Sequence, residues 1–330
     1  MRTGGSVLVT GSAGHLGEAL VRTLRAAGRS VVGLDRVASP FTDVVGSIAD
    51  RSTAEACMDG VGAVIHAATL HKPHVATHDR RAFVETNIAG TLNLLEAAAR
   101  AGVSGFVYTS TTSAFGDALT PPADAPAAWI TEDVVPVPKN IYGVTKVAAE
   151  DLCALAHRNQ GLPCLVLRTS RFFPEPDDDP VARGAYADAN AKATELLHRR
   201  VDIEDVVSAH LCALDRVAAL GFGRYIISAT TPFRREDAAE LRVDAAAVVR
   251  RRVPGLERVY AQLGWRMAPG LDRVYDNARA RAELGWRPEH DFAGMIARGG
   301  DISSPLARAI GRKGYHGDAH RDGRYPVRAK

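Results

Sequence analysis

Near its N-terminus the chain reads Ser6-Val7-Leu8-Val9-Thr10-Gly11-Ser12-Ala13-Gly14-His15-Leu16-Gly17. A β-rich run leads directly into three glycines and then into a helical pattern, as in the strand–turn–helix units that bind dinucleotides. Gly11 allows a tight turn, Gly14 lets backbone approach a pyrophosphate, and Gly17 lets the helix pack closely on the strand. The helix N-terminus would offer free N–H groups to the phosphates. Alone, the three glycines are equally consistent with a purely structural turn.

A carboxylate further along gives the glycine turn its context. Asp35 ends the second β-rich run, about 20 residues beyond the turn, where an acidic side chain hydrogen-bonds the adenosine ribose diol. This charge would repel a 2′-phosphate, so the sequence favours NAD over NADP. Arg36 keeps the alternative open, because an arginine at this place can accommodate the phosphate of NADP.

Short apolar runs alternate with helical patterns through the first half of the chain. After the first strand, the strand-like runs are residues 30–34, 63–66, 105–108 and 162–168, and the longest helical pattern covers residues 80–101. Strands that are apolar on both faces and alternate with helices indicate a parallel sheet covered on both sides. The sequence therefore predicts an α/β fold with a doubly wound parallel sheet of the Rossmann type.

The regular alternation weakens after Arg171. We expect residues 1–171 to form the NAD-binding domain, with residues 200–230, which include one more β-rich run, returning to it. Residues 172–330 would mostly form a smaller C-terminal substrate-binding lobe. Within them, residues 311–330 are rich in Gly and Arg and are expected to be a mobile tail. The proline-containing stretch 116–140 is expected to be a long functional loop.

The composition is that of an ordinary soluble globular protein, with 46% hydrophobic and 24% charged residues and a formal net charge of +3. This charge is too small to indicate a nucleic-acid partner, and no apolar run approaches the ~20 residues of a membrane span. The four cysteines lack C-x-x-C spacing and are expected to be reduced thiols. No signal peptide is expected before the first strand, so a cytoplasmic location is predicted.

The second informative stretch is Tyr142-Gly143-Val144-Thr145-Lys146. Residues four apart on a helix lie on one face, so the lysine cation could stand beside the phenol. A phenol with its ordinary pKa of about 10 is a poor base at neutral pH, and a neighbouring cation lowers that pKa. Such a tyrosine could give or take a proton at a carbinol or carbonyl oxygen. The spacing alone also arises by chance in solvated helices.

Taken in order, these stretches resemble the extended short-chain dehydrogenases/reductases, the NAD-dependent epimerase/dehydratase group. The resemblance covers roughly the whole chain and is densest from Ser6 to Arg171. Besides the glycine turn and the Tyr-x-x-x-Lys pair, the matching motifs are His66-Ala67-Ala68, Asn87-Ile88-Ala89-Gly90-Thr91-Leu92-Asn93-Leu94-Leu95-Glu96-Ala97, Tyr108-Thr109-Ser110-Thr111, Phe115-Gly116 and Arg200-Val201-Asp202-Ile203-Glu204-Asp205-Val206. Such ordered agreement is more specific than any single motif.

The resemblance implies roles at a reaction centre. Tyr142 would be the catalytic acid/base, and Lys146 would hold the nicotinamide ribose and lower the pKa of the tyrosine. Thr111 aligns with the family's serine or threonine that hydrogen-bonds the reacting oxygen, and Ser110 is the second choice. Asn87 would brace the helix near Lys146. For Asn87 and Thr111 the alternative is local hydrogen bonding at the end of an element.

The resemblance also predicts the surrounding contacts. Besides the three glycines, Asp35 and Arg36, the expected cofactor contacts are His15, Leu16, Ser47, Ile48, Ala67 and Ala68, together with Tyr142 and Lys146. The expected substrate contacts are Thr111, Thr112, His71 and Arg171.

At a few positions the sequence differs from the family pattern, and these differences affect which cofactor and substrate groups could be bound. Ser47 stands where the family often has an aspartate that binds adenine. Thr112-Ser113 stand where sugar 4,6-dehydratases carry an Asp-Glu pair, which argues against that elimination. Arg171 replaces the substrate-binding asparagine of nucleotide-sugar epimerases, and could clamp a carboxylate or phosphate of a smaller substrate. Equally, Arg171 could pair with Glu175 or with residues 177–179.

We therefore expect NAD-linked hydride transfer at a secondary alcohol of a hydroxylated small molecule, such as a sugar or an acidic sugar derivative. The motifs are compatible with a dehydrogenase and with an epimerase. A non-sugar alcohol dehydrogenase or ketoreductase, and an NAD-binding sensor without turnover, remain alternatives. No metal is expected, although His71, His74 and His78 could share a helical face and bind zinc. By resemblance, helices at residues 87–101 and 142–158 would form a homodimer.

Overall fold

The computed structural model describes residues 5–175 and 184–311. Its main sheet has seven strands, all paired in parallel, in the order β3-β2-β1-β4-β5-β7-β8. These strands are β1 (Ser6–Thr10), β2 (Val31–Asp35), β3 (Val44–Val45), β4 (Val61–His66), β5 (Phe106–Thr111), β7 (Cys164–Thr169) and β8 (Phe222–Ile227). The strand order reverses at β1, between β2 and β4, so the predicted doubly wound Rossmann sheet is confirmed.

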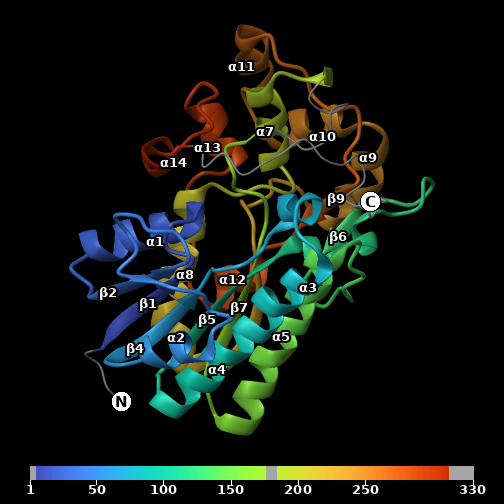
Figure 1. Cartoon of the computed structure of the whole chain (residues 1–330). Coiled ribbons are helices and arrows are strands. Elements are labelled where there is room, and N and C mark those ends of the chain that lie inside the picture. The colour runs from blue at the N-terminus through green and yellow to red at the C-terminus, as the bar shows by residue number, and fades with distance from the viewer. Residues whose placement is uncertain (1–4, 176–183, 312–330) are drawn as a thin grey trace.

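Two apolar cores, one on each face, explain why the strands read as continuous hydrophobic runs (Figure 1). In β1, Val7 and Val9 pack into one core and Leu8 into the other. The first core is covered by α1 (His15–Ala26) and α8 (Ile203–Leu220), and the second by α2 (Arg51–Ala56), α4 (Gly90–Ala101) and α5 (Ile141–Gln160). Because each strand is buried on both faces, hydrophobic residues occupy both sets of alternating positions.

The long helix predicted for residues 80–101 is present but is not uniform. It begins as α3 (Arg80–Phe83), continues as the π-helical turn η2 (Val84–Ala89), and becomes regular again in α4. A π turn inserts one extra residue into the helix and often marks a functional position. Here it contains Asn87, whose side chain is buried.

The stretch predicted as a long loop contains structure that links distant parts of the chain. Short helical turns η3 (Thr112–Phe115) and η4 (Asp117–Leu119) are followed by strand β6 (Ala128–Ile130). This strand pairs in parallel with β9 (Arg273–Tyr275), forming a small second sheet. The segment after β5 is therefore anchored to the C-terminal part of the chain.

A third core lies in the C-terminal part of the chain, beyond the carboxyl ends of the main sheet (Figure 1). Its helices are α7 (Asp188–Leu196), α9 (Ala238–Val243), α10 (Ala245–Arg252), α11 (Leu256–Leu263) and α13 (Phe292–Ala297). Two further helices, α12 (Ala278–Glu283) and α14 (Pro305–Ile310), instead supply side chains to the first core of the sheet. Residues 312–330 of the predicted tail lie outside the described residues, as do residues 177–179.

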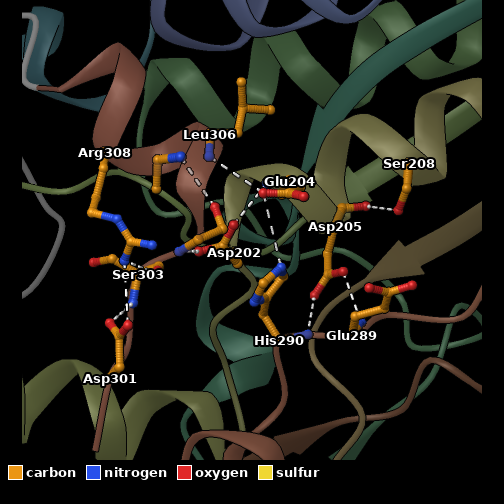
Figure 2. Close-up of polar contacts among 12 residues, drawn as sticks. Asp202, Glu204, Asp205, Ser208, Glu289, His290, Asp301, Ser303, Leu306 and Arg308 are labelled. Carbon is orange, nitrogen blue, oxygen red and sulfur yellow. Dashed lines mark hydrogen bonds and ion pairs between the residues drawn. The ribbon is translucent and has the colours of Figure 1, made fainter. Parts of the chain in front are cut away.

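A group of contacts that we call the C-terminal clasp ties the end of the described chain to the start of α8 (Figure 2). Asp202, Glu204 and Asp205 accept hydrogen bonds from backbone N–H groups, with N···O distances of 2.8 to 3.3 Å. The donors are Glu289, His290, Ser304 and Leu306. Nearby Trp286 is buried in the first core and donates from its indole nitrogen to the carbonyl oxygen of Asp205.

The composition predicts reduced cysteines and no membrane-spanning segment. All four cysteines are free, and burial raises the pKa of the Cys57, Cys153 and Cys212 thiols. These thiols are therefore protonated and poorly nucleophilic at neutral pH. Among the described residues, no helix is long and apolar enough to cross a membrane.

Candidate active site

A cavity of about 980 Å³ opens at the carboxyl ends of the strands that surround the topological switch point. Its walls come from the turn after β1, the segments after β4 and β5, the start of α5 and the residues after β7. It extends to α7 and β9 in the C-terminal part of the chain. Ligands of open parallel sheets bind at this kind of crevice.

The glycine turn forms one end of the cavity, and steric contacts fix two of its glycines. Gly11 has φ +76°, and a Cβ there would lie 2.8 Å from the backbone nitrogen of Ala68. A Cβ on Gly17 would lie 1.9 Å from the carbonyl oxygen of Gly11, so only glycine lets α1 approach the turn this closely. Gly14 lines the cavity immediately before α1 begins. The N–H groups of residues 11–14 are bonded to Leu34, Asp35 and Gly11, so the donors available to a phosphate are those of the first turn of α1, which begins directly after Gly14.

The Asp35 carboxylate lies beside this turn. One oxygen accepts a hydrogen bond from the Ala13 backbone N–H at 3.1 Å, and the other accepts from Val37 at 2.9 Å. Each oxygen retains a further lone pair that could accept a ribose hydroxyl. Arg36 also lines the cavity and is exposed. We call this region, from the glycine turn to Arg36, the nucleotide end.

The other cofactor contacts predicted from the sequence border the same cavity. They are His15, Leu16, Ser47, Ile48, Ala67 and Ala68. Ser47 uses its hydroxyl oxygen to accept the Ala49 N–H at 3.2 Å, which orders the turn after β3. The residues present thus form a continuous surface that fits a dinucleotide, with glycine where a side chain would fill the cradle.

Tyr142 and Thr111 face each other across the middle of the cavity wall. Both line the cavity, both are buried, and the Thr111 side chain is close enough to influence the pKa of Tyr142. Tyr142 is held at the start of α5, where the Asn140 side chain caps the helix by accepting the Gly143 N–H at 3.1 Å. Burial raises the pKa of Tyr142 to about 12, and the nearby Thr111 hydroxyl acts in the opposite direction.

Lys146 lies one turn further along α5 and is also buried. Its ammonium donates to the carbonyl oxygen of Thr109 at 2.6 Å and lies 4.1 Å from the centre of the Tyr108 ring. Burial lowers the pKa of Lys146 to about 7. The sequence predicts that this lysine lowers the pKa of Tyr142, whereas the structure gives the tyrosine a raised pKa. The four-residue spacing of Tyr142 and Lys146 gives no information about desolvation, and desolvation has the largest influence on the pKa of both side chains.

Asn87 makes a long-range brace rather than a local helix-end contact. Its oxygen accepts the Leu70 N–H at 2.8 Å, and its amide nitrogen donates to the Leu70 carbonyl at 2.9 Å. The same nitrogen donates to the Thr145 hydroxyl at 3.0 Å, on the residue before Lys146. The π turn thereby links the segment after β4 to α5. Because these groups are buried, loss of the amide would leave several of them unsatisfied.

The structure distinguishes Ser110 from Thr111. The Ser110 hydroxyl donates to a Glu150 oxygen at 2.5 Å, and Glu150 forms a buried ion pair with Arg168 at 2.8 Å. This network commits the Ser110 hydroxyl to the protein interior, although the residue borders the cavity. The Thr111 hydroxyl is therefore the better candidate to contact a reacting oxygen.

The predicted substrate contacts Thr112, His71 and Arg171 line the end of the cavity that faces α7 and β9, which we call the substrate end. His71 stacks on Phe173 with ring centres 5.6 Å apart. Arg171 borders the cavity and donates to the Glu175 carbonyl oxygen at 3.1 Å, which is a contact with the backbone and not with the carboxylate of the predicted alternative. Glu195, Arg199, Arg273 and Tyr275 also border this end, although no motif marks them in the sequence.

Side chains of the types that bind metals lie close together at two places in the described residues. His71, His74 and His78 are neighbours, with ring centres 4.3 and 5.1 Å apart. In the described ranges, the one set of three ligand-type side chains whose donor atoms all lie within 4.8 Å is Asp202, Glu204 and His290, in the C-terminal clasp. There the positive end of α8 and several N–H donors already engage the carboxylates.

Comparison with known proteins gives a family and several relatives. A family model described as "NAD dependent epimerase/dehydratase family" matches residues 7–227. The chain is 31% identical over 328 residues to a dTDP-glucose 4,6-dehydratase of Streptomyces antibioticus, which covers 89% of this chain and 90% of that protein. It is 32% identical over 191 residues to a 3 beta-hydroxysteroid dehydrogenase/Delta 5-->4-isomerase of Mycobacterium tuberculosis, which covers 52% of this chain. The match spans about half, 48%, of that relative's length.

Among solved structures, the fold is similar to a short-chain dehydrogenase/reductase superfamily protein of Agrobacterium tumefaciens with bound NAD. The two share 26% sequence identity and superpose with a TM-score of 0.64 over 92% of this chain and 97% of the other.

Proposed function

Because this chain belongs to the NAD-dependent epimerase/dehydratase family, we propose that it transfers hydride between NAD and a secondary alcohol of a sugar or sugar-derived substrate. The observation that carries the proposal is that buried Tyr142 and Thr111 line the wall of one cavity whose other end is the glycine turn. The matching family and the NAD-bound structural relative agree with this assignment of the cofactor.

The roles of the side chains follow from their positions. The glycine turn and Asp35 would hold the adenosine diphosphate portion, and Lys146 the nicotinamide ribose. When bound, NAD supplies a hydride acceptor, and NADH a hydride donor. Tyr142 would exchange the proton of the substrate hydroxyl, and Thr111 would hold the same oxygen. With a pKa near 12, Tyr142 is protonated at neutral pH and is best placed to donate a proton to a carbonyl oxygen.

The direction of the reaction and the stereochemical outcome are further parts of the proposal. An oxidoreductase would release the ketone or alcohol, and an epimerase would retain the ketone and return hydride to its other face. Thr112 and Ser113 carry no carboxylate, which disfavours the elimination named for the Streptomyces relative. The Asp35 carboxylate would hydrogen-bond the adenosine ribose and would repel a phosphate at its 2′-position, so we propose NAD rather than NADP.

A homodimer formed through α4 and α5 is also proposed. Apolar side chains of these helices, Leu92 in α4 and Val144 and Leu155 in α5, are between 38% and 49% exposed. Apolar residues exposed on adjacent helices are typical of interfaces between subunits. Light scattering of wild type and Leu155→Glu would test this, with a monomer expected for the variant.

Nucleotide release and turnover would test the function. The purified protein is denatured to identify any retained nucleotide, and is then assayed with NAD and with NADH against panels of sugars, sugar acids, non-sugar alcohols and ketones. Turnover dependent on NAD supports the proposal, and tightly retained NAD favours an epimerase. Saturable NAD binding with no turnover over these panels would instead favour an NAD-binding sensor.

A further inference from the structure

A buried histidine, His66, joins β1 to α4 without lining the cavity. It is the last residue of β4 and is 1% exposed. Its Nδ1 atom lies 2.7 Å from the hydroxyl oxygen of Thr10, and its Nε2 atom lies 2.9 Å from that of Thr91. Both threonines are fully buried. In the part of the chain that the structure describes, none of these three side chains lines the cavity, so they act on a ligand only through other residues.

The neighbouring hydrogen bonds fix which ring nitrogen of His66 carries the proton. The Thr91 hydroxyl donates its single hydrogen to the Asn87 carbonyl oxygen at 2.7 Å, so towards the ring it can only accept. The Nε2 atom of His66 must therefore be the donor. Burial lowers the pKa of His66 to about 3, so at neutral pH the ring carries one proton. The Nδ1 atom is then an acceptor, to which the Thr10 hydroxyl donates.

On the side of Thr10, the hydrogen bonds reach the nucleotide end of the cavity. The Thr10 hydroxyl oxygen accepts the backbone N–H of Ala68 at 3.2 Å. Thr10 directly precedes Gly11, and the same Ala68 nitrogen is the atom that a Cβ on Gly11 would approach to 2.8 Å. Ala68 itself lines the cavity. The Thr10 hydroxyl therefore holds the segment after β4 against the glycine turn.

On the side of Thr91, the hydrogen bonds reach the start of α5. The bond from Thr91 to the Asn87 carbonyl joins residues four apart, and a threonine bonded in this way often bends a helix. Here the bond ends at the π turn η2. The Asn87 side chain donates to the Thr145 hydroxyl at 3.0 Å, which in turn donates to the Tyr142 carbonyl oxygen at 3.0 Å. A continuous series of buried residues thus runs from the glycine turn to the backbone of Tyr142.

Resting on the proposed function, we propose that His66 is a positioning residue that holds the nucleotide end through Thr10 and the π turn beside the reaction centre through Thr91. A neutral imidazole suits this role because it accepts at one nitrogen and donates at the other, whereas an imidazolium could only donate. The two links serve different parts of the site, so they should be separable by substitution. A histidine that only supported the sheet would instead affect NAD binding and turnover together.

Two substitutions of His66 separate the links. Asparagine places its amide near the position of Nδ1, glutamine near that of Nε2, and either amide can donate or accept. His66→Asn therefore keeps the link to Thr10 and loses the link to Thr91, whereas His66→Gln does the reverse. Thr91→Val breaks the second link with His66 in place. Trp286→Phe is the matched control, because it removes a buried ring N–H donor, bonded to Ser208 at 3.0 Å, that does not line the cavity in the described structure.

Three measurements are made on each full-length variant. Calorimetric titration gives the affinity for NAD, and steady-state kinetics give kcat for the best substrate found in the panels of sugars, alcohols and ketones. Amide hydrogen exchange of residues 84–91 reports on the π turn whether or not turnover is found. Urea unfolding gives the stability of each variant, so that kinetic effects can be compared at known stability.

We expect His66→Gln to weaken NAD binding by about 3- to 10-fold, the effect of one lost hydrogen bond, with little change in kcat or in exchange at residues 84–91. His66→Asn and Thr91→Val should instead lower kcat by a similar factor and speed exchange, with little change in NAD affinity. Trp286→Phe should lower stability alone. Equal losses of NAD affinity and kcat in both His66 variants, or no loss in either, would overturn the proposal. If the His66 variants do not fold, Thr91→Val decides it in the same way.

The wild-type ring provides a second test. Nitrogen NMR of protein carrying isotope-labelled histidine distinguishes a protonated from an unprotonated ring nitrogen. The His66 signals are those that disappear in the spectrum of His66→Gln or His66→Asn. We expect the proton on Nε2. A proton on Nδ1 would reverse the direction of the hydrogen bonds and overturn the proposal.

These measurements distinguish failure of the positioning role from failure of the proposed function. If no alcohol is oxidised and no ketone reduced, the proposed function fails, and the contrast between NAD affinity and hydrogen exchange still decides the role of His66. If turnover is found but the His66 and Thr91 variants behave like Trp286→Phe, the proposed function holds and His66 is not a positioning residue.

Discussion

The two ends of the cavity are built in different ways. At the nucleotide end, the glycine turn and Asp35 come from one continuous part of the chain, and Gly11 and Gly17 are fixed by contacts of 2.8 and 1.9 Å that a Cβ would make. At the substrate end, Arg171, Arg199 and Arg273 come from three separate segments, joined by a few hydrogen bonds of the backbone and of the His198 ring. The first end is specified by backbone geometry and the second by side-chain charge. Substitutions should therefore have different consequences at the two ends.

The reaction centre lies between these ends, and Tyr142→Phe should have the largest effect on turnover. Loss of a general acid/base lowers the rate by about 10²- to 10⁴-fold. NAD affinity should change little, because the phenyl ring keeps the packing of the buried tyrosine. Steady-state kinetics and NAD titration would measure the two effects. An unchanged turnover number would show that Tyr142 is not the proton donor.

Gly17→Ala tests whether the nucleotide end is limited by backbone packing. Its Cβ would press on the Gly11 carbonyl, so α1 must shift, and we expect a loss of about 3 kcal/mol in unfolding free energy together with weaker NAD binding. Gly28→Ala is the control, since Gly28 has φ +72° but nothing within 4 Å of the added Cβ. Its cost should be about 1 kcal/mol with unchanged NAD affinity. Equal effects in urea unfolding would contradict the packing argument.

Asp35→Asn tests the one negative charge of the nucleotide end. Removing the carboxylate abolishes its repulsion of a 2′-phosphate while preserving the shape of the side chain. We expect the preference for NAD over NADP to fall by about ten-fold, which corresponds to about 1.4 kcal/mol. Dissociation constants for both dinucleotides would be measured by titration. An unaltered ratio would mean that Arg36 or another group sets the choice.

A further expected effect concerns the acid stability of the region around His66, beneath the nucleotide end. Burial lowers the pKa of His66 to about 3 from its ordinary 6.5, and hydroxyls of Thr10 and Thr91 contact both ring nitrogens. Between these pH values the unfolded chain binds a proton that the folded protein does not. Unfolding free energy should therefore fall with decreasing pH, by about 1.4 kcal/mol per pH unit from this residue.

His66→Gln should remove this contribution to the pH dependence. Asp205, whose pKa burial raises to about 6, acts in the opposite sense and is unchanged in both proteins, so the difference between them isolates the histidine. Urea unfolding of wild type and variant at pH 7, 6 and 5 would measure it. Parallel pH profiles for the two proteins would show that His66 does not titrate on unfolding.

The sequence predicted the nucleotide end more completely than the substrate end for a physical reason. A strand, three glycines and a carboxylate at fixed offsets are local constraints that can be read directly from the chain. The pairing of β6 with β9, which anchors the loop after β5, joins residues 145 apart in sequence at Ala128 and Arg273. The position of Arg273 in the cavity therefore depends on tertiary structure, and nothing in its immediate neighbours indicates it.

Two features near the reaction centre also could not be predicted from local patterns. The helical periodicity of residues 80–101 gives no sign of the π turn that positions Asn87, because the apolar spacing continues on both sides of it. The four-residue spacing of Tyr142 and Lys146 correctly places both on α5, but it does not show how fully they are desolvated. Burial, not the neighbouring charge, dominates both pKa values.

The C-terminal clasp has a consequence for how the protein is made. The first core of the Rossmann sheet includes Trp286 and Ile310, which are synthesised long after β8. Until they leave the ribosome, the first core lacks the side chains of Trp286 and Ile310, and the carboxylates at the start of α8 lack their backbone donors. The N-terminal two-thirds of the chain therefore lacks part of its core packing until these late residues have been synthesised. A stop codon or frameshift late in the coding sequence, far from the nucleotide end, would leave the cofactor domain itself incomplete.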